Sequence, residues 1–273
     1  MINVSSQHLV GDAHLIKFAN GQVYVIDTGN EGDSGGKKLV SYLKKDRINK
    51  IDKLFISHAH RDHYGGLIDL LNSSIVVREI YFNIPDKEVC NQERPWGCDY
   101  DHVMNLRRFI ENRGINLKSM HTGDVYKPNE DAKLKVLFVQ NGTHWDMGKT
   151  DINDTSAVMK LTHGKQSVLF AGDLNRKVGE FLTGSFLDLK ADILKVPHHG
   201  TEAVTTNRFF DAVQPRVAMV PSLTSVWISE RSRRIREYFY SKNIAVYISG
   251  LDGDVSISIW KDSYKVIEGQ SES

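Results

Sequence analysis

The 273-residue sequence contains little cysteine, no excess of charge of either sign and no long apolar run. Its two cysteines, Cys90 and Cys98, are too few for a disulfide-rich scaffold, and the sequence leaves open whether they form a disulfide or two free thiols. The chain has 35 Lys and Arg residues and 34 Asp and Glu residues. This balance of charge excludes a strongly basic nucleic-acid binder of the usual kind. No run of about 18 apolar residues occurs, so no transmembrane helix is predicted.

The first residues also lack the pattern of a signal peptide, because no basic segment followed by an apolar core occurs there. We therefore expect a cytoplasmic protein, although a secreted chain trimmed of its signal would look the same. Apolar residues make up 40% of the chain, enough for a sizeable core, and no internal linker is visible. Composition thus predicts one α/β domain over residues 1–273, with a polar loop inserted at about residues 85–100.

Three histidines and one aspartate lie within six residues, from His58 to His63. An apolar run at 53–56 predicts a buried strand before them, and an apolar segment at 67–71 predicts a short helix after them. In open α/β sheets, ligands bind beyond the carboxyl ends of strands. Histidine and aspartate bind zinc and related metals. We expect His58 and His60 to reach one ion from an extended segment, and Asp62 and His63 to reach a second ion.

The pattern His58-x-His60-x-Asp62-His63 resembles the metal-binding motif of the metallo-β-lactamase superfamily. The resemblance implies an αββα sandwich, in which helices flank two mixed β-sheets, and a site for two divalent ions. Zinc is the expected metal, with manganese or iron as alternatives. The segments Gly11-Asp12-Ala13 and Val196-Pro197-His198-His199-Gly200 further resemble the hydrolase domain of ComEC-type DNA-uptake proteins and the related phosphorylcholine esterases.

The same resemblance implies roles for residues outside the histidine loop. Asp27, which follows a predicted strand, is expected to orient a metal ligand through hydrogen bonds. Asp173 follows a buried strand, where a carboxylate is costly unless it is paired or metal-bound, and is expected to bridge the two ions. His198 is expected to bind the second ion, and His199 to donate a proton or contact the substrate. The sequence leaves the reversed order of these two histidines open.

One ligand of the superfamily pattern has no clear counterpart. A further histidine usually completes the first metal site with His58 and His60, but residues 152–155 read Ile-Asn-Asp-Thr. His144 is the leading candidate for this position. The alternatives are Asn153 or Asp154, water or no ligand, and, as a weaker choice, His121.

Periodicity predicts alternating strands and helices along the rest of the chain. Strands at 14–18 and 22–26, joined by an Asn-Gly turn, predict a hairpin. Helices are expected at 37–45, 103–110, 208–213 and 231–240. Further strands are expected at 75–82, 133–139, 156–161, 167–170, 191–197, 217–220 and 244–248. A last hairpin is expected to turn at residues 251–254.

The resemblance implies a hydrolase in which hydroxide, activated by two ions, attacks the substrate, with Asp62 and His199 in the catalytic machinery. The leading hypothesis is a phosphodiesterase acting on nucleic acid or on a small or cell-wall phosphodiester. Hydrolysis of a lactone, lactam or thioester is one alternative. A non-catalytic binding module is another, against which the nearly complete ligand set argues. Trp96, Tyr100 and Trp227 are candidates for substrate contact, but packing within the fold is the simpler expectation for these aromatic residues.

Overall fold

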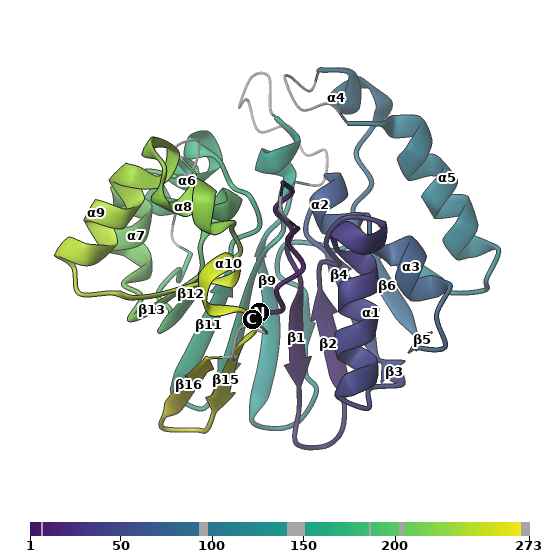
Figure 1. Ribbon diagram of the computed structural model, residues 1–273, viewed down its shortest axis with the longest axis horizontal. Coiled ribbons are helices and arrows are strands. Elements are labelled where there is room, and N and C mark those ends of the chain that lie inside the picture. Colours follow the sequence, from purple (N-terminus) through teal and green to yellow (C-terminus); the bar gives the residue numbers. More distant parts are fainter. Residues whose placement is uncertain (7, 93–97, 141–150, 186, 202–204, 269–273) are drawn as a thin grey trace.

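Two β-sheets pack face to face, and helices cover the outer face of each (Figure 1). This computed structural model describes residues 1–6, 8–92, 98–140, 151–185, 187–201 and 205–268. Aromatic and aliphatic side chains from both sheets fill the space between them, among them Tyr24, Phe55, Val136 and Phe170. The arrangement confirms the predicted αββα sandwich.

The first sheet has five strands in the order β1-β2-β4-β6-β7. β1 pairs antiparallel with β2, which confirms the predicted hairpin, and the other neighbours are parallel. The strands are β1 (His14–Lys17), β2 (Val23–Ile26), β4 (Lys53–Ile56), β6 (Glu79–Phe82) and β7 (Asn116–Lys118). Apolar faces of three helices cover its outer side: α1 (Gly36–Lys45), α3 (Leu67–Leu71) and α5 (Tyr100–Glu111).

The second sheet has seven strands in the order β14-β13-β12-β11-β10-β9-β8. β11 to β14 are parallel neighbours, and β8 to β11 are antiparallel. The strands are β8 (Val125–Tyr126), β9 (Ala132–Phe138), β10 (Val158–His163), β11 (Gln166–Phe170), β12 (Ile193–Lys195), β13 (Val217–Val220) and β14 (Ala245–Ile248). The helices on its outer side are α6 (Arg176–Gly184), α7 (Asn207–Val213), α8 (Thr224–Ile228) and α9 (Arg233–Ser241). Among the described helices, none has the length and apolar character needed to cross a membrane.

Two expectations about local structure are wrong. The strand expected at 75–82 is divided, because β5 (Val76–Val77) pairs with β3 (Lys50–Ile51) while β6 joins the first sheet. The expected hairpin turn at 251–254 is instead a short helix, α10 (Ser249–Asp252), and Gly253 ends it at a φ of 67°. The Asp-Gly signal marked the end of a helix. The last hairpin joins β15 (Val255–Ile259) to β16 (Tyr264–Glu268) further along the chain.

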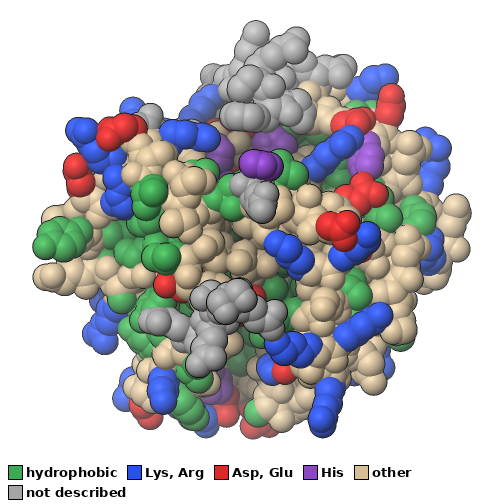
Figure 2. Space-filling view, in the orientation of Figure 1, with side chains coloured by type: hydrophobic (Ala, Val, Ile, Leu, Met, Phe, Trp, Pro, Cys, Tyr) green, Lys and Arg blue, Asp and Glu red, His purple; other side chains and the backbone are tan. Residues whose placement is uncertain are grey.

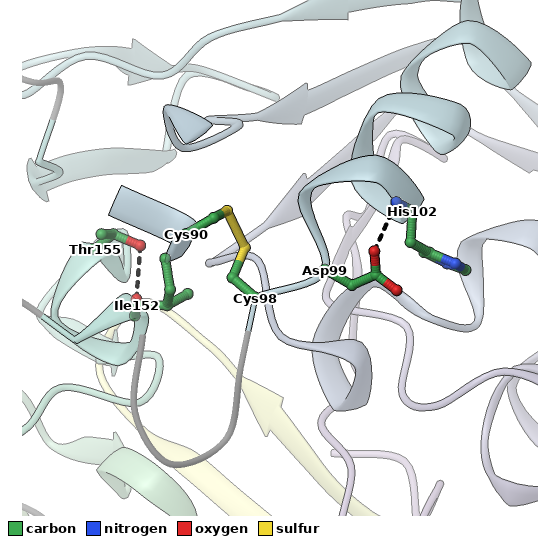
Figure 3. Close-up of a disulfide and its surroundings, with 6 residues drawn as sticks. All are labelled: Cys90, Cys98, Asp99, His102, Ile152 and Thr155. Carbon is green, nitrogen blue, oxygen red and sulfur yellow. Dashed lines mark hydrogen bonds between the residues drawn. A yellow bond between two sulfur atoms is a disulfide. The ribbon is translucent and has the colours of Figure 1, made fainter. Parts of the chain in front are cut away.

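The loop expected at residues 85–100 contains a helix that was not predicted, α4 (Lys87–Gln92). Cys90 in this helix forms a disulfide with Cys98, which lies just before α5 (Figure 3). The carboxylate of Asp99 accepts a hydrogen bond from the backbone N–H of His102 and so caps the start of α5. The disulfide therefore ties α4 to the capped end of α5.

Candidate metal centre

The side chains singled out in the sequence approach one another from the carboxyl ends of strands in both sheets. Asp27 follows β2, the histidine loop follows β4, Asp173 follows β11, and His198 and His199 follow β12. β2 is parallel to β4, and β11 is parallel to β12, so within each sheet these ends lie at the same edge. Histidine side chains gather in the upper part of the face shown in Figure 2.

Four of the expected residues form a tight cluster. Asp62, His63, Asp173 and His199 each offer one ligand atom, and these atoms all lie within 4.8 Å of one another. Asp173 Oδ2 lies 3.2 Å from Nε2 of His63 and 3.2 Å from Nε2 of His199. Asp62 Oδ2 lies 3.0 Å from His199 Nε2. Carboxylate oxygen and imidazole nitrogen are donors that suit zinc, manganese or iron.

A second donor group contains His58, His60 and Asn153. Nε2 of His58 lies 3.1 Å from Nδ1 of His60, and that Nδ1 lies 2.9 Å from Oδ1 of Asn153. Of the alternatives for the missing ligand, Asn153 is therefore the one that contacts the His60 imidazole. The Asp154 carboxylate instead accepts a hydrogen bond from the backbone N–H of Asn175.

His121, the weaker candidate for that position, does not join the second donor group. The His121 ring is exposed, and its Nδ1 lies 3.7 Å from the Asp124 carboxylate. His144 lies outside the described residues.

The electrostatics of the cluster show whether its donors suit a metal cation. Nε2 of His63 is buried and has no hydrogen-bond partner among the described residues, although it faces Asp173. Burial opposes the charged form of His63 and His199, but the carboxylates around them, Asp173 above all, raise both pKa values well above the usual range. The same carboxylates would attract divalent ions to the donors of this cluster. The donor set therefore fits a metal.

Asp27 supports the histidine loop from behind. Its carboxylate accepts hydrogen bonds from the backbone N–H of Ser57 at 2.7 Å and from the Ser57 hydroxyl at 2.8 Å, and it lies 2.8 Å from Nδ1 of His63. The backbone at Asp27 is left-handed, with a φ of 59°, a conformation that aspartate adopts more readily than most residues. These contacts turn Nε2 of His63 toward the cluster, the geometry expected of a residue that orients a ligand.

A buried ion pair that the sequence reasoning missed lies next to the cluster. The Lys195 and Asp12 side chains are 1% and 0% exposed, and their charged groups are in contact. Lys195 Nζ lies 3.0 Å from Asp173 Oδ1 and donates a hydrogen bond to the carbonyl of Gly172 at 2.7 Å. Asp12 Oδ1 lies 3.2 Å from His199 Nδ1. The pair therefore contacts one oxygen of Asp173 and one nitrogen of His199, and it leaves Oδ2 and Nε2 toward the cluster.

A signal for this ion pair is present in the sequence. Lys195 interrupts an otherwise apolar strand segment, and a charge buried in a sheet requires a partner. Asp12 lies just before the first strand, far from Lys195 in the chain. Only the tertiary structure shows that the two residues meet.

His198 and His199 have left-handed backbones, with φ values of 47° and 53°. Nδ1 of His199 donates to the carbonyl of Pro221 at 2.8 Å, which directs Nε2 to the cluster. Nδ1 of His198 lies 2.8 Å from Oδ1 of Asn175, and burial lowers the pKa of His198 to about 4. The geometry favours the reversed order that the sequence left open, with His199 in the cluster and His198 beside it.

The aromatic residues considered for substrate contact pack within the fold where the structure describes them. Trp227 is 6% exposed and lies against Gly200, where an added Cβ atom would come within 2.9 Å of the indole. Gly200 thus permits a close approach of Trp227. Tyr100 packs against the core of the first sheet. Trp96 lies outside the described residues.

A cleft of about 740 Å³ opens beside the cluster. Asp62, Asp173 and His199 line it, and His198, Arg61 and Arg231 contribute to its walls. Arg61 pairs with Asp99 at 2.9 Å. Arg231 has no acidic partner within the described part of the chain. A volume of this size accommodates a small ligand or part of a polymer.

The fold and its donor groups define a class of protein, the metal-dependent hydrolases built on an αββα sandwich. The family model described as the metallo-beta-lactamase superfamily matches residues 8–81. A solved structure, the metallo-beta-lactamase fold protein YhfI from Bacillus subtilis, superposes with a TM-score of 0.52 at 14% identity, covering 89% of this chain and 90% of that one. Residues 8–81 thus resemble the metallo-β-lactamase superfamily in sequence, and the chain shares the fold of such a protein over most of its length.

Curated relatives support the resemblance to ComEC-type domains. ComE operon protein 3 of Bacillus subtilis is 27% identical over 186 residues, which cover 68% of this chain and 22% of the relative. Recombination protein 2 of Haemophilus influenzae is 23% identical over 262 residues, which cover 92% of this chain and 28% of the relative. The chain thus spans between 22% and 28% of the length of these two relatives.

Proposed function

We propose that this metal-dependent hydrolase is a phosphodiesterase. The observation that carries the proposal is the cleft beside the cluster, which combines ligand-type side chains with the guanidinium of Arg231, a group without an acidic partner among the described residues. A phosphodiester is anionic, so it gains from a guanidinium that a neutral lactone or thioester would leave unpaired. The name of the relative Recombination protein 2 supports nucleic acid as the source of the phosphodiester.

We assign the donors to two divalent ions, with zinc expected and manganese or iron as alternatives. Asp62, His63, Asp173 and His199 would hold one ion. His58, His60 and Asn153 would hold the other. Such ions supply an activated water and positive charge for a displacement at phosphorus.

The chain's own groups position these donors and the substrate. Asp27 and Asp12 contact Nδ1 of His63 and of His199, so both rings are oriented before a metal binds. His198 is bonded to Asn175 through Nδ1, which leaves its Nε2 for the substrate in the cleft. Arg231 provides charge for a phosphate oxygen.

A panel of substrates tests the reaction class. Protein reconstituted with zinc or manganese is expected to hydrolyse bis-nitrophenyl phosphate, and to lose this activity on chelation and regain it when metal is returned. The panel also contains single-stranded and duplex DNA, cyclic dinucleotides, nitrocefin and an acyl-lactone. Asp62→Ala, purified in the same way, controls for contaminating phosphodiesterases. Turnover of nitrocefin or the lactone without turnover of any phosphodiester would contradict the proposal.

The Cys90–Cys98 disulfide bears on where the protein works. Structural disulfides persist in oxidising compartments and are rare in the cytosol. The cytoplasmic location expected from the sequence remains a prediction, and the disulfide argues against it. We expect both thiols of protein from its native cells, lysed into an alkylating agent, to resist modification until a reductant is added. Mass spectrometry of the peptides measures this, and immediate alkylation of both cysteines would support the cytoplasm.

A further inference from the structure

A second groove, of about 570 Å³, is formed largely by basic side chains. Lys133 and Lys135 alternate along β9 with Leu134 and Val136, which face the core between the sheets, so the two lysines point to the outer face. The cationic residues that line the groove are Lys133, Lys135, Lys160, Lys165, Lys190 and Arg216. Only two acidic residues, Asp188 and Asp192, line it with them. A chain with a net charge of +1 thus concentrates positive charge here.

Internal ion pairs account for only part of this charge. Lys160 pairs with Asp188 at 2.7 Å, and Lys165 pairs with Asp262 at 2.9 Å. The Asp192 carboxylate accepts hydrogen bonds from the backbone N–H and the hydroxyl of Ser167. Four cations therefore have no acidic partner within the described structure: Lys133, Lys135, Lys190 and Arg216.

The strand register adds an independent observation. Lys135 of β9 lies directly opposite Lys160 of β10 in the antiparallel ladder. Like charges in directly opposed positions destabilise a sheet. Asp188 forms its ion pair with Lys160 and attracts Lys135 without an ion pair, so one carboxylate serves two facing cations. An anion in the groove would offset this repulsion.

The groove and the metal centre lie at opposite ends of the parallel strands of the second sheet. Asp192 and Arg216 precede β12 and β13, whereas the cluster lies beyond the carboxyl ends of the parallel strands. β11 runs from the groove at Ser167 toward Asp173, a path of about 20 Å at roughly 3.3 Å per residue. A ligand that occupied both places would have to be an extended polymer.

We propose that this groove binds the phosphate backbone of a nucleic-acid strand; the inference rests on the proposed function, because the strand is the substrate. None of the described residues that line the groove is aromatic, so the contacts that they offer fall on phosphates and are independent of base sequence. The groove is concave and carries few apolar residues, which suits a strand better than the surface of a lipid bilayer. Short phosphodiesters reach only the metal centre, and long strands engage both sites.

Binding without catalysis tests the groove. Metal-free protein in a chelator is titrated with a fluorescein-labelled 20-nucleotide oligo(dT) at several salt concentrations. Lys135→Glu/Arg216→Glu is expected to weaken binding at least tenfold at low salt. It is also expected to reduce the slope of log affinity against log salt by roughly 1.4, about 0.7 for each lost phosphate contact. The matched control, Lys37→Glu/Lys44→Glu, makes the same change of charge on α1, at the other side of the sandwich, and is expected to change affinity less than threefold.

Catalysis separates failure of the groove from failure of the proposed function. The groove variant is expected to hydrolyse bis-nitrophenyl phosphate at the wild-type rate, and Lys135→Ser/Arg216→Ser replaces it if the acidic variant does not fold. Equal weakening of oligo(dT) binding by the groove and control variants would overturn the inference. Binding of anionic phosphatidylglycerol vesicles without binding of oligo(dT) would also overturn it. A third contrary outcome is a groove variant that aggregates but still binds the strand with wild-type affinity, which would assign the lysines to protection of the sheet edge. The outcomes that would overturn the inference are measured by binding and aggregation, so they do not depend on the wild type being a phosphodiesterase.

Discussion

His199→Ala is expected to lose one of two bound ions and at least a hundredfold of the hydrolysis rate. Its Nε2 lies 3.2 Å from Asp173 and 3.0 Å from Asp62, so removal of the ring takes one of the two nitrogen donors from the four-residue cluster. Even the loss of a residue that only orients a ligand typically weakens metal binding by 10–100-fold. His198→Ala is the matched control, since its ring is bonded to Asn175 through Nδ1 and lies outside the four-residue cluster.

Metal content of the two variants, measured by elemental analysis after reconstitution, checks the assignment separately from activity. We expect His198→Ala to retain both ions and to lose less than tenfold of its rate on bis-nitrophenyl phosphate, a substrate whose leaving group needs no proton. A much larger loss on an alkyl phosphodiester would assign to His198 the proton transfer that the sequence suggested for His199. If His198→Ala loses the metal and His199→Ala keeps it, the roles first expected from the sequence are correct.

Lys195→Met is expected to lower the free energy of unfolding of the metal-free protein by about 3–5 kcal/mol. The substitution removes the ammonium that contacts both Asp12 and Asp173 and leaves two fully buried carboxylates without it. Breaking a buried ion pair by removing one partner costs this much because the other charge stays in a medium of low polarity, whereas removing both partners together costs far less. Lys195→Met/Asp12→Asn is therefore expected to recover at least half of the lost stability.

Urea unfolding in the presence of a chelator measures both variants, and Lys37→Met provides the control. Lys37 pairs with Asp33 at 3.1 Å on the surface, with side chains that are 61% and 90% exposed, so its loss should cost less than about 1 kcal/mol. A double variant that is less stable than Lys195→Met would mean that Asp12 is held mainly by the histidines around it. The ion pair would then have little part in the stability of the centre.

The sequence predicted the αββα architecture through the resemblance that the histidine loop carries. Local patterns predicted single elements, such as the hairpin of alternating apolar residues at 14–18 and 22–26 and the apolar strand before His58. It failed at 251–254, where the Asp-Gly pair ends a helix, since the same left-handed glycine serves a helix end and a hairpin turn.

The parts of the site that the sequence left open depend on side-chain direction and on contacts between distant residues. Which of His198 and His199 enters the cluster depends on two consecutive left-handed residues, which no periodicity encodes. Asp12 and Lys195 meet only because β12 and the segment before β1 converge behind the cluster. Asn153 is one of several polar residues before β10, and its contact with His60 crosses from one sheet to the other.

The left-handed backbone of the two histidines also limits how far the protein can be stabilised. A residue with a side chain costs roughly 1–3 kcal/mol in such a conformation, and glycine adopts it without that penalty. Glycine at position 198 would relieve strain but would remove the imidazole that lines the cleft. Stability and activity thus make opposite demands on one residue. Substitutions that raise the stability of this enzyme therefore belong in other parts of the fold, and the turn at His198 and His199 stays strained.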